Sequence, residues 1–142
     1  MKFIEENIEK DKVEKSLVVG CSVGKLPLEL SKSFKESYGI DYTARYFQMA
    51  TRLLEANVIK YRSVEIHLES FTASKNIHLY QMNPENTDSK KINKIDFMLI
   101  DGLSIRKNTL SKAFDNCLKL FNDKKSIELL IVGETEETNQ LK

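Results

Sequence analysis

The chain has 142 residues, of which 41% are hydrophobic and 30% are charged, a mixture typical of soluble globular proteins rather than of disordered or fibrous ones. Its length fits one domain over residues 1–142 that buries its own core. Twenty-two basic side chains against twenty-one acidic ones give a formal net charge of +1, so no global positive field would attract nucleic acid.

The amino-terminal part of the chain is predicted to form a helix, a strand and a second helix. Residues 2–15 place apolar side chains at helical spacing among Glu and Lys, which indicates an amphipathic helix. A short apolar run from Ser16 to Val19 indicates a buried strand that ends at Gly20. Lys25 to Phe34 then predicts a helix, because its Pro27 falls in the first turn, where a missing amide hydrogen is tolerated.

A second strand and helix are predicted next, followed by an ambiguous stretch. Ser37 to Ile40 indicates a strand that ends at Asp41, and Thr43 to Asn57 indicates an amphipathic helix. The apolar face of that helix comprises Tyr46, Phe47, Ala50, Leu53 and Leu54. Between Tyr61 and Ser74, alternating apolar residues fit an edge strand while other spacings permit a helix, and both interpretations stay open.

The rest of the chain is predicted to alternate strands, a loop and a helix. The expected elements are a strand over 77–82, a polar loop over 83–94, a buried strand over 95–100, a helix over 110–121, a final strand over 127–132 and a polar tail over 134–142. Strands that alternate with helices of this length favour right-handed crossovers. We therefore expect an α/β fold with a mostly parallel sheet of about five strands and helices on both faces.

The final predicted strand, over 127–132, leaves one edge of this sheet unpaired. Exposed apolar edges invite pairing with other strands. We expect this edge to be covered by the tail over 134–142 or to pair with a second copy, which would make the protein a homo-oligomer.

Membrane insertion, secretion and metal binding are disfavoured. The longest apolar runs, such as 97–100, are too short to cross a bilayer, and residues 1–15 lack the apolar core of a signal peptide. The two cysteines, Cys21 and Cys117, lie in no cluster with the spacing of metal ligands. We therefore expect a cytoplasmic protein with no metal site and no disulfide framework.

A glycine-containing turn, Gly20-Cys21-Ser22-Val23-Gly24, follows the first predicted strand. Open α/β sheets bind their ligands beyond the carboxyl ends of the strands, beside the first one. The glycines let the backbone curl tightly, and the amides of the turn and of the next helix can face polar ligand atoms. A strand-to-helix turn that binds nothing explains this fragment equally well.

An acidic residue, Asp41, ends the second predicted strand, 21 residues after Gly20 (41 − 20). This spacing is close to that at which an acid reaches the ribose hydroxyls of a nucleoside cofactor. A carboxylate can accept two hydrogen bonds from a vicinal diol. The competing interpretation is that Asp41 only caps the helix that starts near Thr43.

The turn also discriminates between nucleoside cofactors. A dinucleotide fingerprint needs a middle glycine so that the pyrophosphate can approach the backbone, but Ser22 stands at that position. S-adenosylmethionine has no pyrophosphate. The turn therefore fits S-adenosylmethionine better than NAD.

Two segments resemble class I S-adenosylmethionine-dependent methyltransferases. They are Val19-Gly20-Cys21-Ser22-Val23-Gly24-Lys25, followed by Glu29-Leu30, and Gly39-Ile40-Asp41-Tyr42-Thr43-Ala44-Arg45-Tyr46-Phe47. The match is more specific for the 4-mercaptohistidine methyltransferase domain of ovothiol biosynthesis, which carries Gly-Cys-Ala-Val-Gly-Arg and Gly-Ile-Asp-Phe-Ser-Ala-Arg-Phe. It covers residues 19–50 and thins beyond residue 61. The resemblance implies a Rossmann-like methyltransferase sheet.

The resemblance also implies roles for individual residues. Gly20, Cys21 and Gly24, with Ser22 between them, would line the methionine part of the cofactor. Asp41 would hold the ribose. Tyr42 would lie against the adenine.

Other positions depart from the family pattern. Asn83 stands where the family usually has an acid that meets the adenine amine, and its side-chain oxygen can accept the same bond. Asp101 would lie near the reactive methyl, with no role assigned. The chain stops soon after its fifth predicted strand, so we expect it to lack the last two strands of the family, which help to frame the substrate.

The leading functional hypothesis is a methyltransferase that acts on a small molecule, such as a thiol-histidine compound. Methyl transfer from a sulfonium needs mainly proximity and orientation, so no catalytic triad is required. The alternative is a shortened, non-catalytic methyltransferase-like module that binds the cofactor or a protein partner. With a reduced substrate side, we expect the isolated chain to turn over poorly. A nicotinamide-binding domain is disfavoured by Ser22.

Three further side chains have competing interpretations. His67 and His78 lie in strand-like stretches without a second ligand or paired acid nearby in sequence, so surface or packing roles are expected. Cys21 lies at a helix N-terminus, where thiol pKa values fall, but a small residue in a cofactor turn is the simpler explanation.

Overall fold

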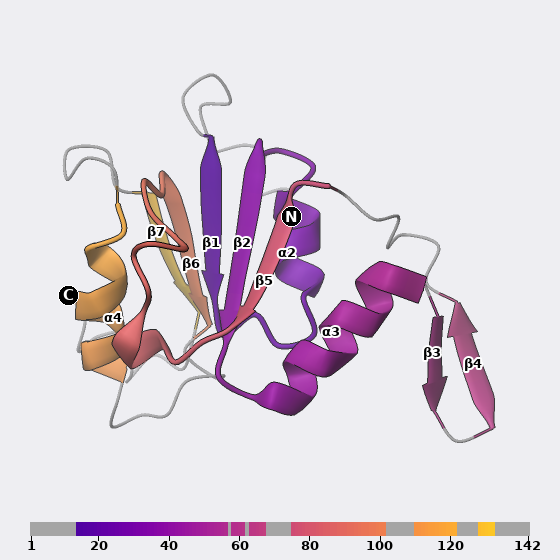
Figure 1. Cartoon of the computed structure of the whole chain (residues 1–142). Helices are drawn as coiled ribbons and strands as arrows, with labels where there is room; N and C mark the ends of the chain where they lie inside the picture. The colour runs from indigo at the N-terminus through magenta and orange to yellow at the C-terminus, as the bar shows by residue number, and fades with distance from the viewer. Residues whose placement is uncertain are drawn as a thin grey trace.

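The computed structural model describes residues 14–56, 58–61, 63–67, 75–101, 110–121 and 128–132. Its strands form a five-stranded sheet with the order β5-β2-β1-β6-β7 and a separate two-stranded sheet, β3-β4 (Figure 1). The tail predicted over 134–142 and nearly all of the helix predicted over 2–15 lie outside the described residues. Of that helix only its last two positions are described, and there the prediction is wrong, because Lys15 already begins the first strand.

Every pairing within the five-stranded sheet is parallel, as the alternation of strands and helices predicts. The strands lie within two residues of their predicted ends. They are β1 (Lys15–Val19), β2 (Glu36–Asp41), β5 (Ile77–Gln81), β6 (Phe97–Asp101) and β7 (Glu128–Val132). The α/β fold class and its mostly parallel sheet are thereby confirmed.

Helices pack on both faces of the sheet, because successive residues of each strand point to opposite sides. On one face, Leu17, Ile40 and Met98 form the largest core cluster with residues of α4 (Leu110–Leu118). On the other face, Val18 and its neighbours pack against α2 (Lys25–Leu30), and a smaller cluster joins α2 to α3 (Ala44–Ala56). The central strand β1 is therefore buried from both sides.

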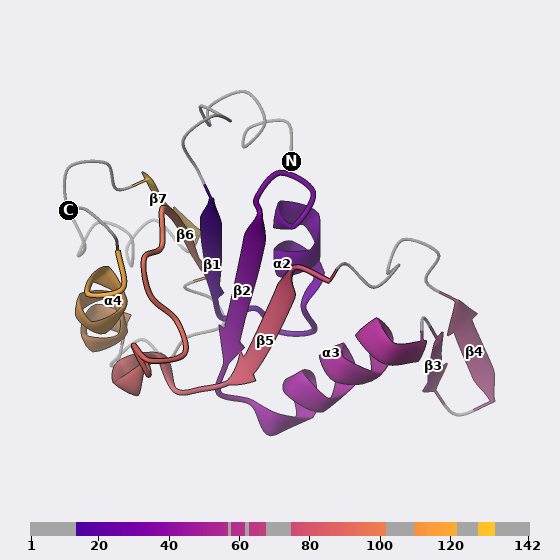
Figure 2. The ribbon, with the colours of Figure 1, turned by 45° about the horizontal axis from the view of Figure 1, so that its top comes forward.

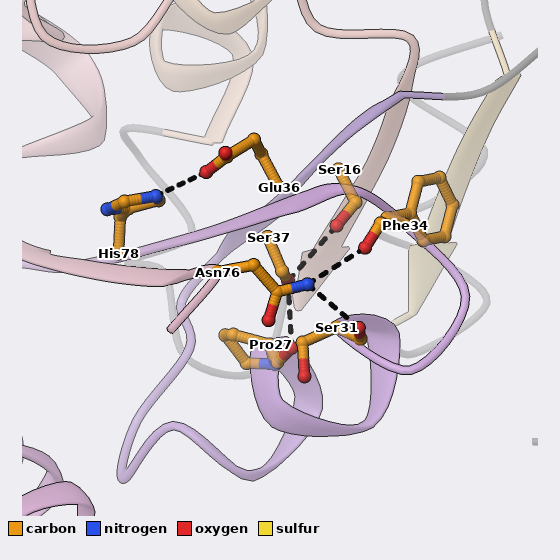
Figure 3. Close-up of polar contacts among 8 residues, drawn as sticks. All are labelled: Ser16, Pro27, Ser31, Phe34, Glu36, Ser37, Asn76 and His78. Carbon is orange, nitrogen blue, oxygen red and sulfur yellow. Dashed lines mark hydrogen bonds and ion pairs between the residues drawn. The ribbon is translucent and has the colours of Figure 1, made fainter. Parts of the chain in front are cut away.

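Helix α2 is shorter than predicted, ending at Leu30 rather than at Phe34. Side chains donate to carbonyl groups in the last turn of the helix and in the turn that follows it. The Ser31 hydroxyl donates to the Leu28 carbonyl at 2.6 Å. The Asn76 amide donates to the carbonyls of Ser31 and Phe34 at 2.9 and 3.0 Å (Figure 3). These bonds end the helix and tie its carboxyl end to the start of β5.

A buried pair of serines fixes the same helix to the sheet. The Ser37 hydroxyl on β2 donates to the Pro27 carbonyl at 2.7 Å, and the Ser16 hydroxyl on β1 donates to Ser37 at 3.1 Å (Figure 3). Both serines are fully buried. Because each hydroxyl is hydrogen-bonded, their burial carries no unsatisfied polar group, and α2 is held in one position over β1 and β2.

Within the stretch that the sequence left open, residues 61–74, lies β4 (Val64–His67), which forms an antiparallel hairpin with β3 (Val58–Tyr61), a strand that begins before that stretch. The edge-strand interpretation is correct in that the segment is extended, but the partner of β4 is β3 and not the main sheet. Figures 1 and 2 show the hairpin beyond the carboxyl end of α3, away from the five-stranded sheet. Residues 68–74 of the open stretch lie outside the described part.

Smaller differences occur in the carboxyl-terminal half. Helix α4 ends at Leu118, three residues earlier than predicted, and Phe121 forms an isolated parallel bridge with Ile95. Strand β6 begins at Phe97, two residues later than predicted. The polar loop predicted over 83–94 contains one turn of 3-10 helix, η1 (Pro84–Asn86). No helix among the described residues is long and apolar enough to cross a membrane.

The sheet has β5 and β7 at its two edges. As predicted for its edge position, β7 pairs with a single strand, β6, within the described residues. Self-association through that edge stays a prediction.

Replacing Gly39 with alanine tests the close contact between β2 and α2. A Cβ at this position would lie 2.7 Å from Pro27 Cγ and 2.7 Å from Leu79 Cδ2. We expect Gly39→Ala to lower the free energy of unfolding by about 1–3 kcal/mol through overpacking. Urea denaturation measures this, with exposed Ser33→Ala as a control expected to change it by less than about 0.5 kcal/mol. Equal effects of the two substitutions would contradict the close contact.

Candidate functional site

The parallel strands bring the predicted site residues to the carboxyl edge of the sheet, which is the side where the strands end and not an outer strand. Strands β1, β2 and β6 end there at Val19, Asp41 and Asp101, and Asn83 follows the end of β5 (Figure 1). The neighbours of β1 are β2 on one side and β6 on the other, so the chain leaves the middle of the sheet in both directions. Such a switch point is where open α/β sheets bind ligands.

The turn between β1 and α2 has a tightly curled backbone. Gly20 and Gly24 have φ angles of 81° and 85°, and Ser22 between them has a φ of 49°. The amides of Gly20 and Cys21 both donate to the Ile40 carbonyl, at 2.9 and 3.1 Å, and the Gly24 amide donates to the Cys21 carbonyl at 2.9 Å. The turn is therefore fixed against the end of β2, beside Asp41.

Gly24 also brings the turn close to α3. A Cβ at Gly24 would lie 3.1 Å from Leu79 Cδ1 and 3.4 Å from the Ala50 Cβ. A side chain there would therefore crowd these neighbours, and the positive φ would strain it further. Both effects explain a glycine at the end of the turn.

Asp41 is the most buried charged residue of this edge, with 3% of its surface exposed. Its Oδ2 accepts the Ser22 amide at 2.9 Å, and its Oδ1 accepts the Thr43 amide at 2.8 Å. The second bond forms a turn just before α3 (Ala44–Ala56), but Asp41 does not accept an amide of the first turn of that helix, as an N-cap would. An ionised carboxylate has about four acceptor positions, so each oxygen retains capacity for one further donor.

The Cys21 side chain points into the core rather than toward a ligand. It packs with Val18 and Leu99 in the cluster beneath α2, with 6% of its surface exposed. Burial, and secondarily the charge of Asp41, raises the pKa of Cys21 to about 12. The thiol is protonated at neutral pH, which argues against the nucleophile interpretation. The contribution of Cys21 to the turn comes from its backbone.

Two exposed tyrosines lie where α3 begins. Tyr42, predicted as a cofactor contact, is 46% exposed, and Tyr46 is 42% exposed. Sequence reasoning missed Tyr46 as a site candidate and counted it in the apolar face of the helix. It shares that face with Ala50 and Leu53, which are buried, but it lies at the end of α3 nearest Asp41. The sequence signal for Tyr46 is a large aromatic residue in the first turn of an amphipathic helix that directly follows the candidate site residue Asp41.

The two remaining predicted residues lie at the same edge with other partners. Asn83 is exposed, and its Oδ1 accepts the Glu85 amide at 2.9 Å, which caps η1. The oxygen proposed for the adenine amine is therefore already bonded once. Asp101 is half-buried at the end of β6, in register with Val132. The structure assigns no chemical role to Asp101.

His78 has an acidic partner, which the sequence did not reveal. Its Nε2 is hydrogen-bonded to the Glu36 carboxylate on β2, and its ring stacks on Tyr38 with ring centroids 4.9 Å apart (Figure 3). Both contacts link β5 to β2. His78 is the second residue of β5 and lies near the amino ends of the strands, whereas Asp41 lies at the carboxyl end of β2. His78 therefore does not join the candidate site. Among the described residues, no three metal-ligating side chains cluster.

No protein-family model and no curated protein matches the sequence. Solved structures do resemble the chain. Precorrin-8W decarboxylase from Methanobacterium thermoautotrophicum matches with a TM-score of 0.65 and 17% identity, over 92% of this chain and 60% of that one. An S-adenosylmethionine-dependent methyltransferase from Clostridium acetobutylicum matches with a TM-score of 0.60 and 17% identity, over 85% and 44%. Magnesium protoporphyrin IX methyltransferase from Synechocystis, solved with S-adenosylmethionine, matches with a TM-score of 0.63 and 11% identity, over 99% and 62%.

These similarities establish the fold. The chain has the Rossmann-like sheet that is shared by structures of S-adenosylmethionine-dependent methyltransferases. It spans between 44% and 62% of the length of the three structures compared.

Burial of both cysteines predicts slow thiol chemistry in the folded protein. Burial raises the pKa of Cys21 and of Cys117 to about 12, so at pH 8 the thiolate fraction is roughly a thousandfold below that of an exposed thiol. We expect Ellman's reagent to label neither cysteine rapidly at pH 8. The urea-unfolded chain serves as the control, and both of its cysteines should react rapidly with the reagent. Rapid labelling of one thiol in the native protein would contradict its burial.

The same pKa shifts predict that alkaline pH destabilises the fold. In the unfolded chain the thiols lose their protons near their ordinary pKa of 9.0, whereas the folded protein keeps them up to about 12. Stability that is complete below pH 9 is therefore lost as pH rises toward 12. Urea midpoints at pH 8 and pH 10.5 measure the loss. Cys117→Ala should show a shallower fall than the wild type, and equal slopes would contradict the contribution of Cys117.

Proposed function

We propose that this chain binds S-adenosylmethionine at the carboxyl edge of its sheet and transfers the methyl group to a small molecule. The observation that carries the proposal is the direct bond between the Asp41 carboxylate and the Ser22 amide. It joins the glycine turn and the acid at the end of β2 into one polar corner. That corner lies at the switch point of the sheet, beside β1.

The hydrogen bonds of the turn favour this cofactor over a dinucleotide. The amides of Gly20, Cys21, Ser22 and Gly24 all donate to protein oxygens. A pyrophosphate needs backbone amides that are free to donate to it. S-adenosylmethionine has no pyrophosphate and needs no such cradle, because it carries a ribose, an adenine and an amino acid part with both ammonium and carboxylate groups.

The residues at the edge fit the parts of such a cofactor. The unused acceptor positions of Asp41 suit the two hydroxyls of a ribose. Tyr42, exposed and next in sequence, offers an aromatic face to an adenine. The turn over residues 20–24 would lie beside the amino acid part. The cofactor itself would supply an activated methyl group, so the protein's task is to orient the acceptor.

A thiol-histidine compound is the acceptor that we propose first. The support is the sequence resemblance over residues 19–50 to the 4-mercaptohistidine methyltransferase domain. The Clostridium acetobutylicum and Synechocystis proteins are methyltransferases by name, and the latter is a magnesium protoporphyrin IX methyltransferase. The fold match is compatible with a methyltransferase and leaves the acceptor open.

The alternative is a module that binds the cofactor without turning it over. One observation favours it: the Asn83 oxygen that would meet the adenine amine already accepts the Glu85 amide, which leaves one acceptor position in a side chain that caps η1. Incubation with labelled S-adenosylmethionine and a panel of small thiols and imidazoles separates the two functions. Multiple turnovers would support the enzyme, and cofactor binding without methyl incorporation would support the module.

Calorimetric titration tests the cofactor. We expect S-adenosylhomocysteine to bind and NADH not to bind. Asp41→Ala should weaken the binding by about 1.5–3 kcal/mol, the scale of hydrogen bonds to a charged group, or roughly tenfold to a hundredfold in Kd. Asp115→Ala, an exposed aspartate on α4, is the matched control and should leave Kd unchanged. Unaltered affinity in Asp41→Ala would remove Asp41 from the site.

A further inference from the structure

Ser22 has a backbone conformation that its residue type disfavours. Its φ of 49° lies in the left-handed region, where a Cβ comes too close to the following carbonyl. Only Ser22 and Lys94 combine a side chain with a positive φ among the described residues. Gly20 and Gly24, which flank Ser22, also have positive φ angles but carry no Cβ. Ser22 therefore needs an interaction that holds it in place.

The bond from Asp41 supplies that interaction. The Ser22 amide donates to Asp41 Oδ2 at 2.9 Å, and the carboxylate is almost completely buried. A hydrogen bond to a charged acceptor is about twice as strong as a neutral one, and burial shields it from competing water. The other oxygen accepts the Thr43 amide, so the carboxylate cannot rotate without breaking one of its two bonds.

We propose that Asp41 is a positioning residue for the glycine turn, holding Ser22 in its left-handed conformation before any ligand binds. This inference builds on the proposed cofactor site. Cofactor affinity then depends on Asp41 in two ways, through its own contact with the ligand and through the shape that it imposes on the turn. The second contribution to the affinity can be measured separately, because it disappears when residue 22 is changed to one that adopts a positive φ without steric cost.

A glycine at position 22 removes that need. Glycine adopts positive φ without steric cost, so Ser22→Gly lets the turn form even when the carboxylate is absent. Because Ser22 lies in the proposed cofactor turn, the effect of Ser22→Gly on the Kd for S-adenosylhomocysteine in the wild type is the reference against which its effect in the Asp41→Ala variant is compared. In the Asp41→Ala background Ser22→Gly should recover roughly fivefold or more of the lost affinity, because it restores the shape of the turn but not the ligand contact.

The four proteins form a double-mutant cycle that decides the question. They are the wild type, Asp41→Ala, Ser22→Gly and the double variant, each titrated calorimetrically with S-adenosylhomocysteine. If Asp41 acts only by touching the ligand, Ser22→Gly will have the same effect in both backgrounds. That additive result would overturn the positioning role.

A second measurement needs no ligand. Hydrogen exchange of the Ser22 amide, followed by NMR in the ligand-free protein, should be roughly tenfold faster or more in Asp41→Ala than in the wild type. Asp96→Ala is a matched control, since Asp96 Oδ2 accepts the amides of Glu14 and Lys15 at 3.1 and 2.9 Å, next to the amino end of β1. It should leave Ser22 exchange unchanged. Equal exchange of Ser22 in Asp41→Ala and the wild type would overturn the proposal.

The exchange experiment also separates this inference from the proposed function. Faster Ser22 exchange in Asp41→Ala, with no binding of S-adenosylhomocysteine to the wild type, would reject the cofactor and keep the positioning role. If Asp41→Ala does not fold, Asp41→Asn replaces it. Asparagine offers one acceptor oxygen to two amides, so exchange of Ser22 or Thr43 should increase. Unchanged exchange of both amides would overturn the proposal.

Discussion

The buried carboxylate of Asp41 joins three parts of the fold that meet at one corner. It ends β2, accepts the amide of Ser22 in the turn after β1, and accepts the amide of Thr43 where α3 begins. A buried charge is stable only when it is hydrogen-bonded, so the turn that contains Ser22 and the segment that leads into α3 at Thr43 are both held in place by this one side chain. The candidate site is built around that requirement.

The opposite end of α2 is fixed by neutral hydrogen bonds. The amide of Asn76, the residue before β5, donates to the carbonyls of Ser31 and Phe34 just after α2. The hydroxyl of Ser37 on β2 donates to the Pro27 carbonyl within the helix. The helix is thus held at its carboxyl end by the sheet and at its amino end by the turn. Gly39 lets Pro27 approach β2 between these two anchors. A short helix of six residues obtains from these contacts a stability that its own length does not provide.

The sequence predicts the main sheet well because buried parallel strands are short apolar runs between polar boundaries. It also places Gly20 and Asp41 at one edge, because strand ends in a parallel sheet coincide. It does not predict that β4 pairs with β3, since alternating residues mark an extended strand but not its partner. The partners of Asn83 and His78 are likewise hidden, because each depends on side-chain geometry that spacing does not encode.

The hydrogen bonding of the turn bears on which ligands this edge can accept. Its amides, apart from that of Val23, are assigned to protein oxygens, so an anion would meet few free donors there. The ends of β2 and β6 add two carboxylates, Asp41 and Asp101, on either side of β1. A phosphate group would find few donors at this corner, whereas hydroxyl groups can donate to the Asp41 carboxylate. In the proposed cofactor site, Ser22 would therefore bear on ligand choice through the amide that it donates to Asp41 as well as through the bulk of its side chain.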